Sequence, residues 1–268
     1  NIMGGVLAYI KGYKNIFWNI RSAEISYTNM KKKTIFIIFF EIFLSYFIPK
    51  KIISCSKRAI EVHKNIFYCK NKFVYIPNGI QDKYILKNKV TINKKPVIGM
   101  VARLDSQKNH INFLKSLSYI KHPIHFILLG RGVDGINLSK YDIKKNISIT
   151  LMGEINNIFP IYDTFDFLLL PSIYGEAFPN VLMEAMSRGV VCISSDVGDS
   201  LSIISSTGYV IKDPYDPLSI AESIKCAVED FDLNHAAYRL KSGSSILQIR
   251  SNFKLSNIIA KYNHTWMS

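Results

Sequence analysis

The sequence predicts an α/β protein built on a parallel β-sheet that helices cover on both faces. Short apolar runs recur from about residue 50 onward, and stretches with helical character separate them. Strands that are buried on both faces consist of nearly continuous apolar residues, and their alternation with helices is typical of doubly wound parallel sheets. In such sheets ligands bind beyond the carboxyl ends of the strands, so functional residues are expected there.

Residues 1–80 predict only part of such a sheet. Strand-like runs lie around residues 15–20, 51–55 and 72–76, and the second of these leads into a helix that ends near Tyr68. Two or three strands are too few for a complete doubly wound domain. We therefore expect residues 1–80 to form the carboxyl-terminal portion of an incomplete domain.

An apolar segment from Thr34 to Ile48 resembles a membrane span in composition. It is shorter than the roughly 20 residues that a spanning helix needs, and Glu41 lies in its middle. We interpret it as a buried or half-buried helix that ends at Pro49. Lysines at 31–33 and 50–51 flank this helix, so a role at a membrane surface stays an open alternative.

Residues 96–243 predict one complete domain. The polar, lysine-rich residues 81–95 precede it as a linker, and residues 244–268 follow as a helical tail. The predicted strands of the domain are 96–101, 125–130, 147–153, 165–170, 190–194 and 208–211, and its predicted helices are 109–120, 179–188 and 217–229.

The 268-residue chain carries a formal net charge of +14, from 34 Lys and Arg against 20 Asp and Glu. A lysine-rich composition bias, phosphate-bearing substrates and an anionic membrane surface all account for this charge. The basic residues are spread along the chain without a nucleic-acid module, so we expect no nucleic-acid partner. Four cysteines without metal-type spacing and six scattered histidines predict reduced, mostly buried thiols in a cytosolic protein, with no metal and no cofactor.

The most informative stretch of the sequence runs from Pro171 to Gly189. It follows an apolar strand and holds Glu176 and Glu184 around a predicted helix start at Pro179. Free backbone N–H groups at a helix start bind anions, and carboxylates bind sugar hydroxyls. If both glutamates were helical, eight residues would separate them by about 12 Å on one face. The stretch predicts a pocket for a phosphate with a sugar on each side, as in a nucleotide sugar.

Other candidates follow neighbouring strands. Arg103 and Lys108 come after the strand 96–101, and two cations there suit a diphosphate leaving group that gains charge as its bond breaks. Gly130 and Gly153 end two further strands and are predicted to form pocket walls. Arg21 follows the first apolar run, where either a cleft-facing or a surface position fits the sequence.

Taken together, these residues resemble the retaining glycosyltransferases of the GT-B fold, in glycosyltransferase family four (glycosyl transferases group 1). The stretch from Pro171 to Gly189 is the specific part of the resemblance. Supporting parts follow in chain order: Trp18–Ser22, Ile76–Ile80, Arg103 with Lys108, Leu129–Gly130 and Met152–Gly153.

The resemblance implies a nucleoside-diphosphate sugar as donor and a complete, Rossmann-like donor-binding domain after a partial Rossmann-like acceptor-side domain. It implies that Glu176 contacts the donor sugar, that Glu184 contacts the ribose, and that Arg103 and Lys108 hold the diphosphate. It also implies metal-independent transfer with retention, to a glycan or lipid-linked acceptor in surface polysaccharide biosynthesis. The remaining donor-binding positions that it implies are Ala177, Phe178, Pro179, Asn180, Gly130, Gly153, Ser172 and Arg21.

The sequence departs from the family pattern in two places. Ala177 stands where many members carry glycine, a small change that we expect the pocket to tolerate. Nothing before Trp18 resembles the first strand and glycine-rich loop of the fold, so we expect an amino-terminally truncated chain that lacks roughly half of its acceptor domain.

Three functional interpretations stay open at this point. The first is a transferase in the cytoplasm or at the inner face of the plasma membrane. The second is a donor-binding module that is inactive without its missing half or a partner. The third is a sugar-nucleotide epimerase, since that class shares the fold.

Overall fold

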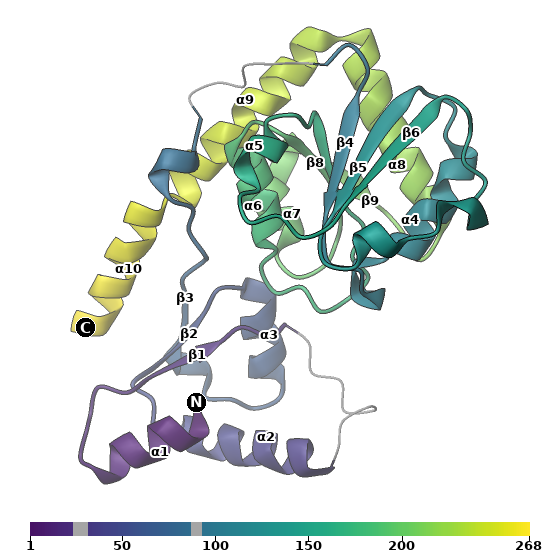
Figure 1. The fold of residues 1–268 in the computed structure, drawn as a ribbon. Helices are drawn as coiled ribbons and strands as arrows, with labels where there is room; N and C mark the ends of the chain where they lie inside the picture. Colours follow the sequence, from purple (N-terminus) through teal and green to yellow (C-terminus); the bar gives the residue numbers. More distant parts are fainter. Residues whose placement is uncertain (24–31, 87–92) are drawn as a thin grey trace.

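The computed structural model describes residues 1–23, 32–86 and 93–268, and these form two parallel β-sheets with helices around them (Figure 1). Parts of two sequence predictions lie outside the described residues: Lys31 of the basic cluster and residues 87–92 of the predicted linker.

The first sheet has three parallel strands in the order β1-β2-β3. β1 (Phe17–Ile20), β2 (Lys51–Ser54) and β3 (Phe73–Tyr75) coincide with the three predicted runs. Trp18, Ile52 and Tyr68 form the centre of its small core. Three helices accompany this sheet: α1 (Ile2–Ile10), α2 (Lys32–Ser45) and α3 (Lys57–Asn65).

Helix α2 is present where the sequence predicted a helix, but the predicted burial is wrong for much of its surface. Phe36, Phe39 and Phe43 are 72%, 63% and 59% exposed. The helix packs on the first core mainly through Ile42 and Leu44, so its other faces are in solvent in this structure. No helix among the described residues is long and apolar enough to cross a membrane.

The second sheet has six parallel strands in the order β6-β5-β4-β7-β8-β9. β4 and β7 are central neighbours and far apart in sequence, paired as Ile98↔Phe167 and Gly99↔Leu168. All six strands were predicted, within a few residues. Their bounds are β4 (Val97–Val101), β5 (Ile124–Leu129), β6 (Ile147–Met152), β7 (Phe167–Leu170), β8 (Val191–Ser195) and β9 (Tyr209–Ile211).

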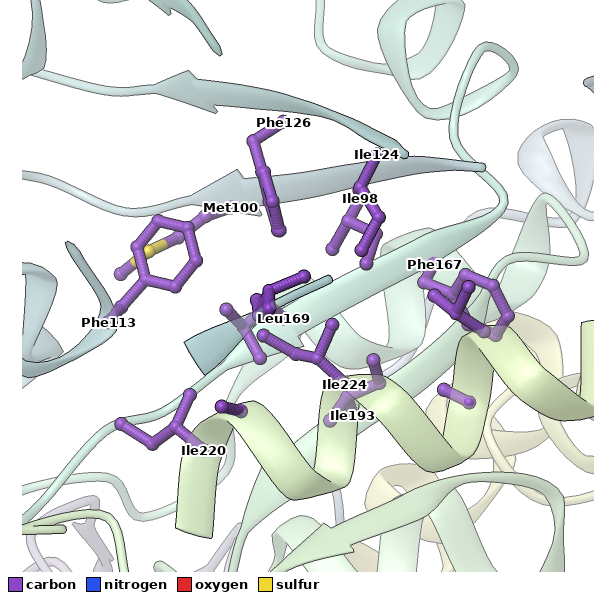
Figure 2. Packing of buried hydrophobic residues seen from close by; sticks show 14 of the residues in the cluster. Ile98, Met100, Phe113, Ile124, Phe126, Phe167, Leu169, Ile193, Ile220 and Ile224 are labelled. Atoms are coloured by element: carbon purple, nitrogen blue, oxygen red, sulfur yellow. The ribbon is translucent and has the colours of Figure 1, made fainter. Parts of the chain in front are cut away.

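Helices cover both faces of this sheet, as predicted. On one face Ile220 and Ile224 of α8 (Pro217–Leu233) join the same buried cluster as Leu169 (Figure 2). On the other face Leu168 and Leu170 pack in a second cluster with residues of α6 (Asn180–Ser187). Alternate β7 residues therefore enter opposite cores, which explains its continuous apolar sequence. The other helices are α4 (His110–Ser116), α5 (Phe159–Tyr162), α7 (Ser200–Ile204), α9 (His235–Asn252) and α10 (Leu255–Met267).

The carboxyl-terminal helices return to the first sheet. α9 continues across residues 243 and 244, and α10 follows it after a short break. The backbone of Ile80 pairs with Phe253 and Leu255, and Ile258 of α10 packs against Ile53 and Ile76 of the first domain. The tail thus links both sheets, while the domain bounds set at 80, 95 and 243 stay predictions.

The absence of a side chain at Gly99 is required by packing in the centre of the second sheet. A Cβ there would overlap the ring of Phe165. We expect Gly99→Ala to lower the free energy of unfolding by about 3 kcal/mol through overpacking. Gly243→Ala, at a half-buried position of α9 where a Cβ meets nothing within 4 Å, is the control and should raise it by up to about 1 kcal/mol. Urea unfolding of both variants measures the difference, and equal effects would contradict this packing.

Candidate functional site

The loops that follow β4 and β7 meet beyond the carboxyl ends of these strands. The Ile173 N–H donates to the carbonyl of Gln107 at 3.0 Å, and the Asn109 side chain donates to the carbonyl of Pro171, also at 3.0 Å. Parallel pairing of β4 with β7 places the two loops at the same edge of the sheet. The predicted residues after both strands are therefore brought together.

An ion pair between Lys108 and Glu176 joins the two loops. The side chains of Lys108 and Glu176 are 15% and 10% exposed. Ser172 donates its hydroxyl to Glu176 Oε1 at 2.9 Å. Charged hydrogen bonds of this kind fix the carboxylate orientation. Of the predicted site residues, these three form the most buried polar group, and Ser172 supports Glu176.

Arg103 lies on the same loop as Lys108 and is half exposed. Its Nε donates to Asp105 Oδ2 at 3.1 Å. The residue lines a cavity of about 390 Å³ with Gly130, Arg131 and Glu154. Gly130 has a φ of +140°, and a Cβ there would collide with the carbonyl of Ala102. Its lack of a side chain lets this wall of the cavity lie close to the loop after β4.

Glu184 lies within α6 and lines a second cavity of about 370 Å³. Tyr162 donates its hydroxyl to Glu184 Oε2 at 2.9 Å. Burial raises the pKa of Glu184 from its ordinary value of 4.5, although the Tyr162 hydrogen bond acts in the opposite direction. Asn180 and Arg21 line the same cavity, so the structure brings Arg21 of the first domain to the predicted donor residues.

Consecutive residues at the start of α5 line the two cavities. Ile158 lines the first cavity and Phe159 lines the second. The first cavity is lined by two arginines and Glu154, and the second by Arg21, the half-buried Glu184 and side-chain amides. The arginines suit an anionic group of a ligand, and the carboxylate and amides suit its hydroxyl groups.

The helical spacing expected between Glu176 and Glu184 is wrong. α6 begins at Asn180, with Pro179 as its N-cap residue, so Glu176 lies in the preceding loop and only Glu184 is helical. The positive φ of +74° at Gly175 turns the chain before Glu176. This turn directs the first carboxylate toward Lys108 rather than along the helix face.

The other predicted positions have different surroundings. Phe178 is buried, with its ring centroid 5.6 Å from that of Phe253. The Ala177 carbonyl accepts a hydrogen bond from the Asp199 N–H. Gly153 lines neither of the two cavities, and a Cβ there would make an ordinary contact with Asp134. Phe178 and Gly153 therefore lie outside the polar part of the site.

Sequence reasoning missed several residues of the site. Tyr162 and Asn78 form hydrogen bonds with Glu184 and Asn180, respectively. Asn78 belongs to a segment quoted for the family resemblance, and that was a usable signal. Tyr162 had none, because a tyrosine in a short helix is ordinary in a core.

A third cavity, of about 600 Å³, is lined by none of the predicted site residues. It lies beside α4 and is lined by His110, Lys140 and Tyr141, among others. Burial lowers the pKa of His110 to about 4, so its imidazole is neutral at pH 7. Both His110 ring nitrogens are buried, without a hydrogen-bond partner among the described residues.

The free cysteines match their expectation only in part. Cys55 and Cys192 are buried, Cys69 is half-buried and Cys226 is exposed. Burial raises the pKa of the Cys55 and Cys192 thiols, which keeps both protonated at neutral pH.

Comparison with known proteins agrees with this fold. The family model described as "Glycosyl transferases group 1" matches residues 82–239, which is more than half of the chain. The chain therefore belongs to the glycosyl transferases group 1 family. Its two parallel sheets with their covering helices, together with the family match, confirm the predicted α/β fold class of GT-B type.

Curated relatives act on lipid-linked sugars. The chain is 25% identical over 240 residues to an Escherichia coli protein named UDP-Gal:alpha-D-GlcNAc-diphosphoundecaprenol alpha-1,3-galactosyltransferase, covering 79% of this chain and 59% of the relative. It is 25% identical over 151 residues to a Campylobacter jejuni protein named N,N'-diacetylbacillosaminyl-diphospho-undecaprenol alpha-1,3-N-acetylgalactosaminyltransferase, covering 56% and 40%. The chain thus spans about half the length of these relatives.

Among solved structures, Anabaena HepE in complex with UDP-glucose superposes with a TM-score of 0.79. The two chains are 15% identical, and the match covers 98% of this chain and 74% of that one. At this identity the likeness establishes the fold alone.

The ion pair between Lys108 and Glu176 predicts a strong coupling in stability. Lys108→Met leaves a buried carboxylate without its cation, and we expect it to lower the free energy of unfolding by about 3 kcal/mol. Adding Glu176→Gln should restore much of this loss, because the unpaired charge is then gone. Urea unfolding of the single and double variants measures the coupling.

The control for this cycle is Lys225→Met, which breaks an exposed ion pair with Glu229. It should change the unfolding free energy by less than about 0.5 kcal/mol. A Lys108→Met variant as stable as this control would contradict the buried pair.

The raised pKa of Glu184 predicts a pH dependence of stability. Above about pH 4.5 the unfolded chain has lost this proton and the folded chain still holds it, so stability falls as pH rises toward the raised pKa. Glu184→Gln removes this term, and the variant should be more stable than the wild type at pH 7. Urea unfolding between pH 4.5 and 8 tests this, with the exposed Glu222→Gln as control. A variant with the wild-type pH slope would contradict the burial of a charged group.

Proposed function

We propose that the protein is a retaining glycosyltransferase that moves a sugar from a nucleoside-diphosphate sugar to a glycan or lipid-linked acceptor in surface polysaccharide biosynthesis. The observation that carries the proposal is the buried group of Lys108, Glu176 and Ser172 at the edge of the second sheet. It lies between the strand ends and the start of α6, where an anionic group of a ligand meets free backbone N–H groups.

Four of the predicted site residues have defined roles in this proposal. Arg103, with its planar guanidinium in the first cavity, and Lys108 hold the diphosphate. Glu176 accepts hydrogen bonds from hydroxyls of the donor sugar. Glu184, in the second cavity, accepts hydrogen bonds from the ribose. Family membership and the UDP-glucose-bound HepE structure support a nucleotide sugar as the donor class.

The proposed transfer needs no side chain as covalent intermediate. The bond between the anomeric carbon and the leaving phosphate oxygen breaks, and a bond to the acceptor oxygen forms on the same face. The acceptor proton moves to the leaving phosphate. Arg103 and Lys108 stabilise the negative charge that develops on the diphosphate, which is the step that electrostatic catalysis accelerates most.

The acceptor class rests on the names of the relatives. Two of them are named for undecaprenol-diphosphate substrates. A lipid-linked acceptor is presented at a membrane surface, so we place the enzyme in the cytoplasm, peripherally at the inner face of the plasma membrane. The net charge of +14 supports attraction to anionic lipids.

Calorimetric titration with UDP tests the donor site in the 268-residue chain. We expect binding by the wild type and about tenfold weaker binding by Arg103→Ala, because one charged hydrogen-bonding group on the diphosphate is lost. Arg239→Ala, at an exposed position of α9, is the matched control and should bind like the wild type.

Assays with a radiolabelled UDP-sugar extend the test to chemistry. If Glu176→Ala and Arg103→Ala each left donor turnover unchanged, the assigned site would be wrong. UDP binding without turnover would identify a donor-binding module, and a changed sugar without an acceptor would identify an epimerase. Failure of the wild-type chain to bind UDP would contradict all three.

A further inference from the structure

Asp199 uses its carboxylate in an unusual way for its position. It is the N-cap residue of α7, where an aspartate normally accepts a hydrogen bond from the first turn of its own helix. Its side chain makes no such bond. Instead it reaches the other domain of the molecule.

The carboxylate of Asp199 binds the start of α3 in the first domain. It accepts hydrogen bonds from Ser56 Oγ at 2.7 Å, from the Lys57 N–H at 2.8 Å and from the Arg58 N–H at 3.0 Å. Asp199 is 3% exposed and Ser56 is fully buried. A carboxylate at a helix amino terminus also interacts favourably with the helix dipole. Each domain therefore supplies half of a buried, charged interaction.

The other side of the same turn contacts the donor loop directly. The Asp199 N–H donates to the carbonyl of Ala177 at 3.0 Å. Gly198, with a φ of +62°, packs so closely that a Cβ there would collide with the carbonyls of Glu176 and Ala177. The turn at residues 198–199 thus packs directly against the backbone that carries Glu176 and Ala177.

From these contacts we infer that Asp199 is a positioning residue that couples the docking of the first domain to the conformation of the Glu176–Ala177 backbone. The chain of contacts runs from α3 through the Asp199 carboxylate and main chain to the donor loop. That the loop binds a donor rests on the proposed function. The coupling itself rests only on the contacts between the two domains.

Hydrogen–deuterium exchange on the whole chain tests the coupling without any ligand. Asp199→Asn keeps the shape but replaces one acceptor oxygen by an NH₂ group that faces the α3 donors. We expect exchange to accelerate at least about tenfold in peptides that cover residues 56–60 and 174–178, from the loss of charged hydrogen bonds. Ser56→Ala also removes the cap bond from the Ala59 N–H, so it should accelerate exchange further at residues 56–60. At residues 174–178 it should act in the same direction as Asp199→Asn, and adding it to that variant should add little there.

Asp216→Asn is the matched control, because Asp216 caps the start of α8 within its own domain, by accepting from the Leu218 N–H. It should leave exchange at residues 174–178 unchanged. Acceleration confined to residues 56–60 in Asp199→Asn, or seen at 174–178 in the control, would overturn the inference.

UDP titration of the same variants tests the consequence for the site. We expect about tenfold weaker binding by Asp199→Asn and unchanged binding by Asp216→Asn. Unchanged affinity in Asp199→Asn would overturn the positioning role. Absence of UDP binding by the wild type would instead count against the proposed function, and the exchange comparison would still decide the coupling.

Discussion

The buried ion pair between Lys108 and Glu176 is the interaction on which the site depends. It joins the loop after β4 to the loop after β7, its neighbour in the sheet. Lys108 and Glu176 are 68 residues apart in the sequence. Removing two charges from water is costly, and only mutual pairing with added hydrogen bonds offsets this cost. The hydroxyl of Ser172 supplies one such bond. The pair therefore orders the cation and the carboxylate before a ligand arrives, which is the preorganisation that electrostatic catalysis requires.

Contacts of two different kinds hold the two domains together. α10 brings apolar side chains to the first domain, and Ile258 packs there with Ile53 and Ile76. At a second contact between the domains, the buried carboxylate of Asp199 accepts hydrogen bonds from the start of α3. The apolar contacts lack direction, whereas the carboxylate fixes orientation. Together they bring Arg21 to the cavity that Glu184 lines.

The sequence was sufficient for the strands of both sheets, because a buried parallel strand such as β7 has an unmistakable apolar pattern. It was also sufficient for the pairing of the loops, since parallel topology places both at one edge. It was insufficient for the burial of α2, whose packing depends on what else covers the first sheet. It placed the start of α6 within one residue but not the direction of the Glu176 side chain, because the turn at Gly175 depends on local geometry. Asp199 was missed because its partners lie in another domain.

A crystal structure of the chain with UDP-glucose tests the central claim most directly, since it locates the ligand among the cavities. The account predicts the diphosphate within hydrogen-bonding distance of Arg103 and Lys108, and the ribose hydroxyls on Glu184. Nucleotide bound instead in the larger cavity beside α4, next to His110, would contradict it.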